Sequence, residues 1–137
     1  MQDIHHSIET QADRDEIVRA LMTQRGLASW WGRRASVEND TVTLNFTKEG
    51  QEIIMTFTVE SAADPISWLC VDNGNPAWIG TRLTWNVTEG DDSRVIEFTH
   101  SGFEVGGPPY ESTRQIWGHF VSSLDSYLAA GRGQPWD

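Results

Sequence analysis

The sequence predicts an α+β fold in which a curved antiparallel sheet wraps around one long C-terminal helix, with two short helices near the N-terminus. Apolar residues alternate with polar ones through most of residues 41–100, as in half-buried strands. They recur at helical spacing within residues 111–131 and, over a shorter stretch, within residues 13–26. Because no linker-like or repeated stretch divides its 137 residues, we expect a single domain over residues 1–137.

The N-terminal segment is predicted to hold one strand and the two short helices. Residues 4–10 are tolerant of β-structure and predict the strand. A helix is expected over residues 13–26, because Asp13 and Glu16 form a capping-box pattern and Gly26 is expected to end the helix as a left-handed cap. The following LASWW predicts a second short helix or turn, which the next glycine ends.

Five further strands, joined by short connections, are predicted to form an antiparallel meander. Their expected ranges are 41–47, 52–60, 66–72, 78–87 and 94–100. The third is apolar on both faces, which indicates either a strand covered on both sides or one whose register the pattern does not assign. Each of the others presents one apolar face, and only the helix of residues 111–131, capped by Gly131, is large enough to cover those faces.

Charge and composition narrow the classes of partner. Twenty acidic residues against ten basic ones give a net charge of −10, which disfavours nucleic acid and anionic membranes as partners. Arg33 and Arg34 are interpreted as part of a solvated loop. The sequence has neither the apolar core of a secretion signal nor a membrane-spanning stretch, and Cys70 is the single cysteine. We therefore expect a cytoplasmic protein without an internal disulfide.

Three motifs carry a resemblance to a known family. They are Leu27, Trp30, Trp31 and Gly32 after the first helix, FTHSGF at residues 98–103, and WGHFVSSLDSYLAAGRG at residues 117–133. In this order they resemble the SRPBCC superfamily of START and Bet v 1-like proteins, and within it the family of bacterial homologues of the activator of the Hsp90 ATPase. The resemblance implies a helix-grip fold with a cavity between the sheet and the C-terminal helix. It implies no catalytic residue, because the family has no shared catalytic set.

Candidate ligand-binding residues are those expected to face that cavity. They are Trp30, Trp31, Phe46, Met55, Phe57, Trp85, Phe98, His100, Phe103, Trp117, Phe120 and Leu124. One interpretation is a pocket for a small apolar or aromatic molecule, and the other is a core that these side chains simply fill. His100 places an ionisable group on an apolar face, where it would either orient a ligand or act in acid–base chemistry, or else hold the following bend by a structural hydrogen bond.

The leading functional hypothesis is a binding module that is not an enzyme. The alternatives are a stress-related or protein-interaction role with a chaperone contact, which the resemblance implies, and a cavity enzyme such as a cyclase or hydrolase. No cofactor or metal is expected, because the sequence has no glycine-rich phosphate loop and His5 and His6 point to opposite faces of a strand. A homodimer is expected because Trp78 and Trp136 are interpreted as exposed.

Overall fold

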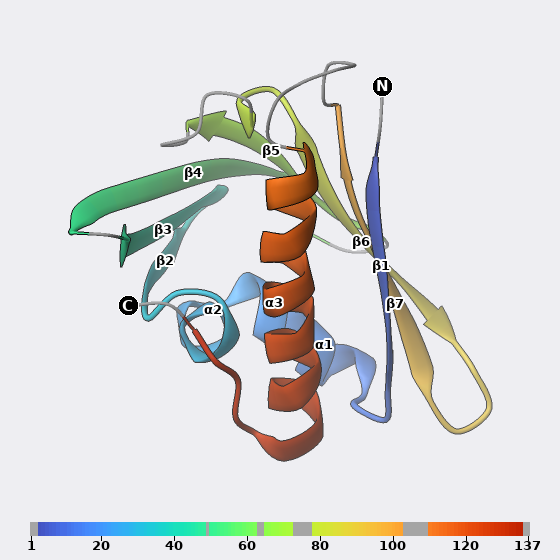
Figure 1. The fold of residues 1–137 in the computed structure, drawn as a ribbon. Coiled ribbons are helices and arrows are strands. Elements are labelled where there is room, and N and C mark those ends of the chain that lie inside the picture. The colour runs from blue at the N-terminus through green and yellow to red at the C-terminus, as the bar shows by residue number, and fades with distance from the viewer. Residues whose placement is uncertain (1–2, 49, 63–64, 73–77, 103–109, 136–137) are drawn as a thin grey trace.

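A computed structural model describes residues 3–48, 50–62, 65–72, 78–102 and 110–135 (Figure 1). The strands of the sheet are β1 (Ile4–Thr10), β2 (Arg34–Glu38), β3 (Thr41–Lys48), β4 (Gln51–Ala62), β5 (Ile66–Asp72), β6 (Arg82–Glu89) and β7 (Arg94–Ser101). The helices are α1 (Arg14–Met22), α2 (Gln24–Trp30) and α3 (Tyr110–Ala130). The predicted α+β architecture, with a C-terminal helix and two short helices near the N-terminus, is confirmed.

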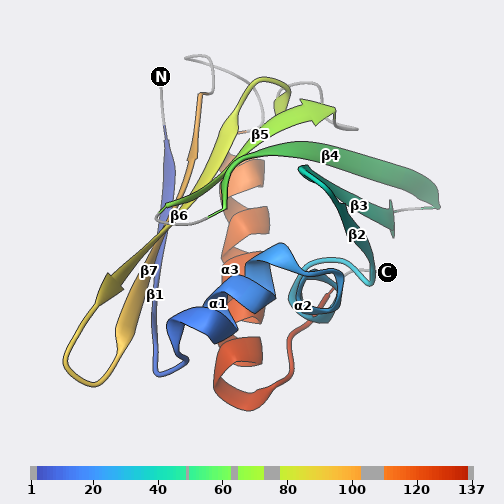
Figure 2. The same ribbon diagram turned by 180° about the vertical axis from the view of Figure 1, so that it is seen from behind.

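The sheet is antiparallel and curves around α3. Its order is β1-β7-β6-β5-β4-β3-β2, so the first strand of the chain lies beside the last. The ladder between β4 and β5 shifts register twice, between Thr56 and Phe57 and between Val59 and Ser61. Such irregularities bend and twist a sheet. In Figures 1 and 2 the sheet bends around α3, while α1 and α2 lie beside the C-terminal half of that helix.

The strand β2 corrects the sequence analysis, which predicts no strand between residues 11 and 40. Arg34 begins β2 instead of lying in a solvated loop. Its guanidinium donates to Thr47 Oγ1 on β3 at 2.9 Å and lies 3.7 Å from Glu52 Oε2 on β4. Only Ala35 and Val37 turn toward the core. Because two small apolar residues give too little alternation, pairing with β3 determines this strand more than its own pattern does.

The junction of α1 and α2 also differs from the prediction. Asp13 caps α1 as expected, with its side chain accepting from the Glu16 amide at 2.8 Å. The helix ends at Met22, however, and not at Gly26. Thr23 adopts an extended conformation, and its hydroxyl donates to the Arg19 carbonyl at 2.6 Å and accepts from the Gly26 amide at 3.0 Å. One side chain therefore closes the first helix and opens the second.

A turn replaces the predicted beginning of the fourth meander strand. The strand expected over residues 78–87 begins at Arg82, and the chain reverses at Gly80, whose φ is 88° and whose amide donates to the Cys70 carbonyl at 2.8 Å. This turn leaves Ile79 50% exposed and directs Trp78 into the core at 2% exposure. The expectation that Trp78 is exposed is therefore wrong, and Trp136 lies outside the described residues.

The segment that follows α3 is fastened to α2. Ser123 of α3 is buried, and its hydroxyl donates to the Trp30 carbonyl at 2.7 Å while accepting from the Gln134 amide at 2.6 Å. A Cβ at Gly133 would lie 2.6 Å from the Ser29 carbonyl oxygen, so this close crossing requires glycine. Ser123 thereby joins α3, the end of α2 and the C-terminal segment.

The close contact of α1 with α2 gives a first prediction. A Cβ at Gly26 would overlap the Arg19 carbonyl oxygen and lie 2.7 Å from Ala20 Cα, and neither backbone atom can move independently of α1. We expect Gly26→Ala to lower the free energy of unfolding by roughly 1–3 kcal/mol. In Gly118→Ala, the matched helical control, the new Cβ meets nothing within 4 Å. That variant should gain up to about 1 kcal/mol.

Urea unfolding of the two variants and the wild type measures both effects. Equal stability of Gly26→Ala and the wild type would show that α1 and α2 are not in the contact described.

Candidate functional site

Among the described residues, nine buried aromatic side chains gather between the sheet and α3, and we call them the aromatic cluster. They come from α2 and the residue after it, from β4, β5, β6 and β7, from the turn before β6, and from α3. Its members are Trp30, Trp31, Phe57, Trp68, Trp78, Trp85, Phe98, Trp117 and Phe120, each at most 2% exposed. Neighbouring rings lie with their centroids 4.3 to 6.2 Å apart, the usual range for packed aromatic pairs.

Trp31 is the most central of these residues. It follows the last helical residue of α2, and its ring stacks on Trp30 at 5.3 Å and on Trp68 at 5.9 Å. Its ring also lies 5.2 Å from Trp117 of α3 and 5.7 Å from Phe57 of β4. Trp31 therefore contacts the sheet, α2 and α3 at once.

Trp30 serves the same cluster from the side of α1. Its indole N–H donates to the Ala20 carbonyl of α1 at 2.8 Å, and its ring meets Trp85 edge-on at 5.8 Å. The bond to Ala20 orients the ring and satisfies a buried donor. Trp30 thus joins α1 to the sheet.

His100 lies at the centre of a short hydrogen-bonded chain. Thr81 Oγ1 donates its one proton to the Trp78 carbonyl oxygen at 2.5 Å, so it must accept from His100 Nε2 at 2.7 Å. Trp117 Nε1 donates to His100 Nδ1 at 2.9 Å. The imidazole is therefore neutral, with its proton on Nε2, because a proton on Nδ1 would face the indole N–H.

Burial reinforces this neutral state. His100 is fully buried, and burial lowers the pKa of its imidazole from 6.5 to about 3. A histidine used in acid–base catalysis near neutral pH needs a pKa close to the working pH. The geometry favours the structural role that the sequence analysis weighed against ligand orientation and acid–base chemistry.

The sequence-predicted candidates that the structure describes lie together. Met55 and Leu124 belong to the same hydrophobic core, and the remaining described candidates are members of the aromatic cluster or, for His100, bonded to it. Phe103 and the side chain of Phe46 lie outside the described residues. Two members were missed. Trp68 lies in the run that is apolar on both phases, and the turn before β6 reverses the expected exposure of Trp78.

The indole N–H groups of the cluster fall into two sets. Those of Trp30, Trp78 and Trp117 have protein partners, the second of them at 3.4 Å from Thr113 Oγ1. Those of Trp31, Trp68 and Trp85 are buried and have no hydrogen-bond partner in the described part of the chain. Buried donors are normally paired, so the second set calls for an explanation.

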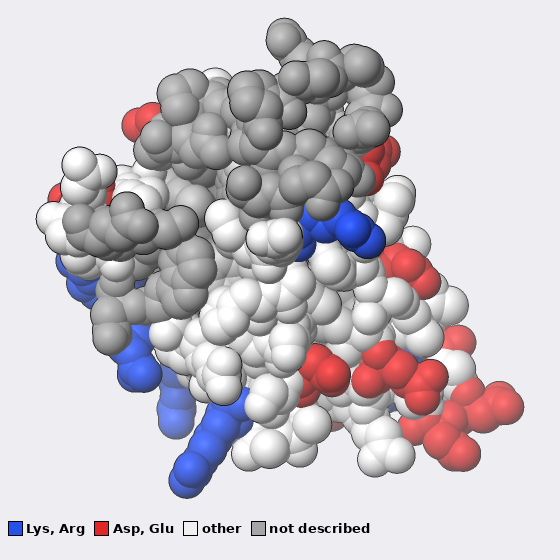
Figure 3. Space-filling model, in the orientation of Figure 1, with Lys and Arg blue, Asp and Glu red and all other residues white. Residues whose placement is uncertain are grey.

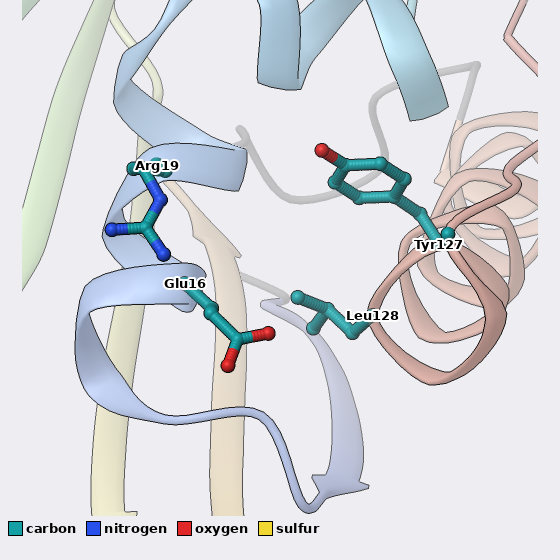
Figure 4. Close-up of a pocket in the computed structure, with 5 residues that line it drawn as sticks. Glu16, Arg19, Tyr127 and Leu128 are labelled. Atoms are coloured by element: carbon teal, nitrogen blue, oxygen red, sulfur yellow. The ribbon is translucent and has the colours of Figure 1, made fainter.

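A separate surface pocket lies between α1 and the C-terminal end of α3 (Figure 4). It has a volume of about 280 Å³ and is lined by Glu16, Arg19, Tyr127, Leu128 and Gly131. A neighbouring hollow of about 420 Å³ shares Glu16 and Leu128, and Glu9 and Asp125 make its lining acidic. In Figure 3 acidic side chains gather toward the β6–β7 hairpin and basic ones toward α2 and β2. Neither hollow contains a sequence-predicted candidate.

The described part of the chain holds neither a metal-binding cluster nor a helix that could span a membrane. Among the described residues, no three His, Cys, Asp or Glu side chains are placed to hold a metal ion. None of the described helices combines the length and the apolar character that crossing a bilayer requires.

Comparison with known proteins shows which solved structures this chain resembles. No protein-family model and no curated relative matches the sequence. Solved structures do match. The Aha1 dimer from Colwellia psychrerythraea superposes with a TM-score of 0.79 at 25% identity, over 97% of this chain and 100% of that one. The chain therefore resembles Aha1-like SRPBCC proteins in its fold as well as in its sequence motifs.

Two other solved structures share this fold. A Staphylococcus saprophyticus protein superposes with a TM-score of 0.75 at 16% identity, over 99% of this chain and 98% of that one. A START superfamily protein from Mycobacterium smegmatis superposes with a TM-score of 0.67 at 13% identity, over 92% of this chain and 96% of that one. These two establish the helix-grip fold alone, and the resemblance seen in the sequence motifs is confirmed.

The buried imidazole gives a second prediction. Because the folded pKa lies below the unfolded one, unfolded His100 binds a proton between about pH 6.5 and pH 3 that the folded state excludes. Its contribution to stability is therefore complete above pH 6.5 and is lost as the pH falls, at up to about 1.4 kcal/mol per pH unit. His100→Asn should flatten this part of the stability profile, whereas the exposed-site control His5→Asn should not.

Urea unfolding at a series of pH values measures the slope, and nitrogen chemical shifts of the imidazole report its tautomer. A titration of His100 near pH 6.5 in the folded protein would contradict the buried, neutral state.

Proposed function

We propose that this SRPBCC protein is a binding module for a small, mainly apolar molecule that docks on the aromatic cluster. The observation that carries the proposal is the gathering of the described sequence-predicted candidates on one buried surface between the sheet and α3. Aromatic surfaces with few polar groups are typical of sites for apolar ligands. The superfamily relationship supports a ligand-binding module of this kind.

The geometry favours binding over catalysis. Both ring nitrogens of His100 are engaged by Thr81 and Trp117, and its lowered pKa keeps it neutral. The other buried polar residues of the described core are Thr10, Thr81, Thr113 and Ser123. Thr81 lies beside His100, but the protonated Nε2 donates to its hydroxyl, so the imidazole does not act as a base that would activate it. A binding role needs only the apolar surface and a few oriented hydrogen bonds.

The packing also limits the ligand's size. Trp31, Trp68 and Trp117 are in ring contact and fully buried, so a large lipid would have to displace several rings. Displacing packed aromatic side chains is costly. We therefore expect a compact ligand of one or two rings that enters beside the cluster and displaces few side chains.

Tryptophan fluorescence tests the proposal directly, since six of the seven tryptophans belong to the cluster. Titration with one- and two-ring apolar compounds should change the emission and raise the thermal midpoint of unfolding in proportion to occupancy. Ile54→Ala, which alters an exposed residue of β4, serves as the control and should bind equally well. If no compound changes either reading, the binding proposal fails.

A homodimer is a second proposal, and one specific match favours it. The Colwellia psychrerythraea protein that covers nearly the whole of this chain is described as a dimer. In this chain Ile54 of β4 and Val71 of β5 are 43% and 42% exposed on the outer side of neighbouring strands. Exposed apolar residues of this kind are suited to an interface core, although the exposure predicted for Trp78 no longer supports the dimer.

Sedimentation equilibrium measures the association. We expect a dimer that the double variant Ile54→Asp/Val71→Asp weakens at least tenfold, because two buried carboxylates would face each other across the interface. The control Thr88→Asp, at an exposed position of β6, should leave the association unchanged. A wild-type protein that remains monomeric at high concentration would overturn this proposal.

A further inference from the structure

The six tryptophans of the aromatic cluster differ in whether their indole N–H groups have a hydrogen-bond partner. Trp30, Trp78 and Trp117 donate to Ala20 O, Thr113 Oγ1 and His100 Nδ1, which belong to the protein. The three remaining donors, on Trp31, Trp68 and Trp85, are buried without a partner in the described part of the chain. Their side chains are fully buried, so bulk water does not reach them.

The three unpartnered tryptophans are neighbours in space. Trp31 stacks on Trp68 with an interplanar angle of 8° and a centroid distance of 5.9 Å. Trp68 in turn meets Trp85 edge-on at 6.2 Å. They come from the end of α2, from β5 and from β6, so separate parts of the chain bring three free donors into one contiguous set of rings.

The aromatic cluster has free hydrogen-bond donors, whereas the acceptors bonded to it are already occupied. Three N–H donors are free, whereas His100 Nδ1 and the Trp78 carbonyl oxygen, which are acceptors elsewhere along the aromatic cluster, already receive hydrogen bonds from Trp117 and Thr81. A buried donor without an acceptor costs free energy, and an incoming acceptor recovers it. A compound that brings a donor of its own would leave that donor unpaired.

We infer that the ligand is a neutral ring compound bearing a carbonyl oxygen, such as a cyclic ketone or quinone, whose oxygen accepts from one or two of the free indole N–H groups of Trp31, Trp68 and Trp85. The inference rests on the proposed function and specifies the chemistry of the same site. An uncharged carbonyl fits better than a carboxylate, because no cation belongs to the aromatic cluster to offset the desolvation of an anion. A site that offers only N–H donors also disfavours alcohols, because the proton of the ligand's hydroxyl group would have no acceptor.

Three compounds of matched size provide the test: indane, 1-indanol and 1-indanone. They share a bicyclic skeleton and differ only in carrying no polar group, a hydroxyl or a carbonyl. Calorimetric titration of the wild-type protein should show 1-indanone binding about tenfold more tightly than indane, equivalent to about 1.4 kcal/mol, with 1-indanol between them. The carbonyl stretching band of bound 1-indanone should shift to lower frequency, as expected for a ketone that accepts hydrogen bonds.

Matched variants separate the donors from the rings. Trp68→Phe and Trp85→Phe each keep an aromatic ring and remove one free N–H, so each should reduce the preference for 1-indanone over indane while leaving indane binding in place. Trp30→Phe is the control, because its N–H is already bonded to Ala20 O. That variant should lose stability and keep the preference.

The possible outcomes are distinguishable. Equal binding of indane and 1-indanone, with an unshifted carbonyl band, overturns the inference and leaves the binding module intact; this is the result expected if water or ring faces already satisfy the donors. Binding of none of the three compounds also overturns the inference, and the wider fluorescence titration then decides whether the proposed function fails as well. If a variant does not fold, the carbonyl band of the wild-type complex still decides.

Discussion

The burial of Trp31 where α2, the sheet and α3 meet is the constraint on which the rest of the structure depends. Its ring lies against rings from α2, from β4 and β5, and from α3, and it has no exposed surface. Protein interiors are packed too closely to absorb a shift of so large a side chain. The end of α2 therefore sets the separation of α3 from the sheet. The spacing between α3 and the sheet therefore depends on one residue, Trp31, which directly follows the seven-residue helix α2.

Apolar packing alone would leave the rings free to adopt several arrangements of similar energy. The chain of hydrogen bonds from Trp117 through His100 and Thr81 to the Trp78 carbonyl selects one of them, since each bond has a direction. It joins α3, β7 and the turn before β6. Tryptophans with bonded N–H groups fix the architecture in this way, and those with free N–H groups remain for the proposed ligand.

Most elements could be predicted from sequence because their burial follows their own periodicity. The alternation of Ile96, Phe98 and His100 in β7 is an example, and the helical spacing in α3 is another. β2 and the turn at Trp78 could not, because their positions depend on pairing and packing with distant residues. The same holds for the site. The apolar periodicity of the strands and of α3 predicted which aromatic rings lie together. Whether each indole N–H is hydrogen-bonded depends on the position of an acceptor from elsewhere in the chain, such as the Ala20 carbonyl oxygen.

The contacts that close the structure join the two ends of the chain. β1 pairs with β7, and Ser123 bonds to the Trp30 carbonyl across 93 residues of sequence. During synthesis, α2 and the early strands leave the ribosome well before Trp117 and Ser123 have been made. Their apolar faces then stay exposed to solvent until α3 has been made, and contacts of such long sequence separation form slowly. The arrangement that gives a tightly packed core in the finished protein therefore leaves apolar surface of the nascent chain exposed until the C-terminal helix has been made.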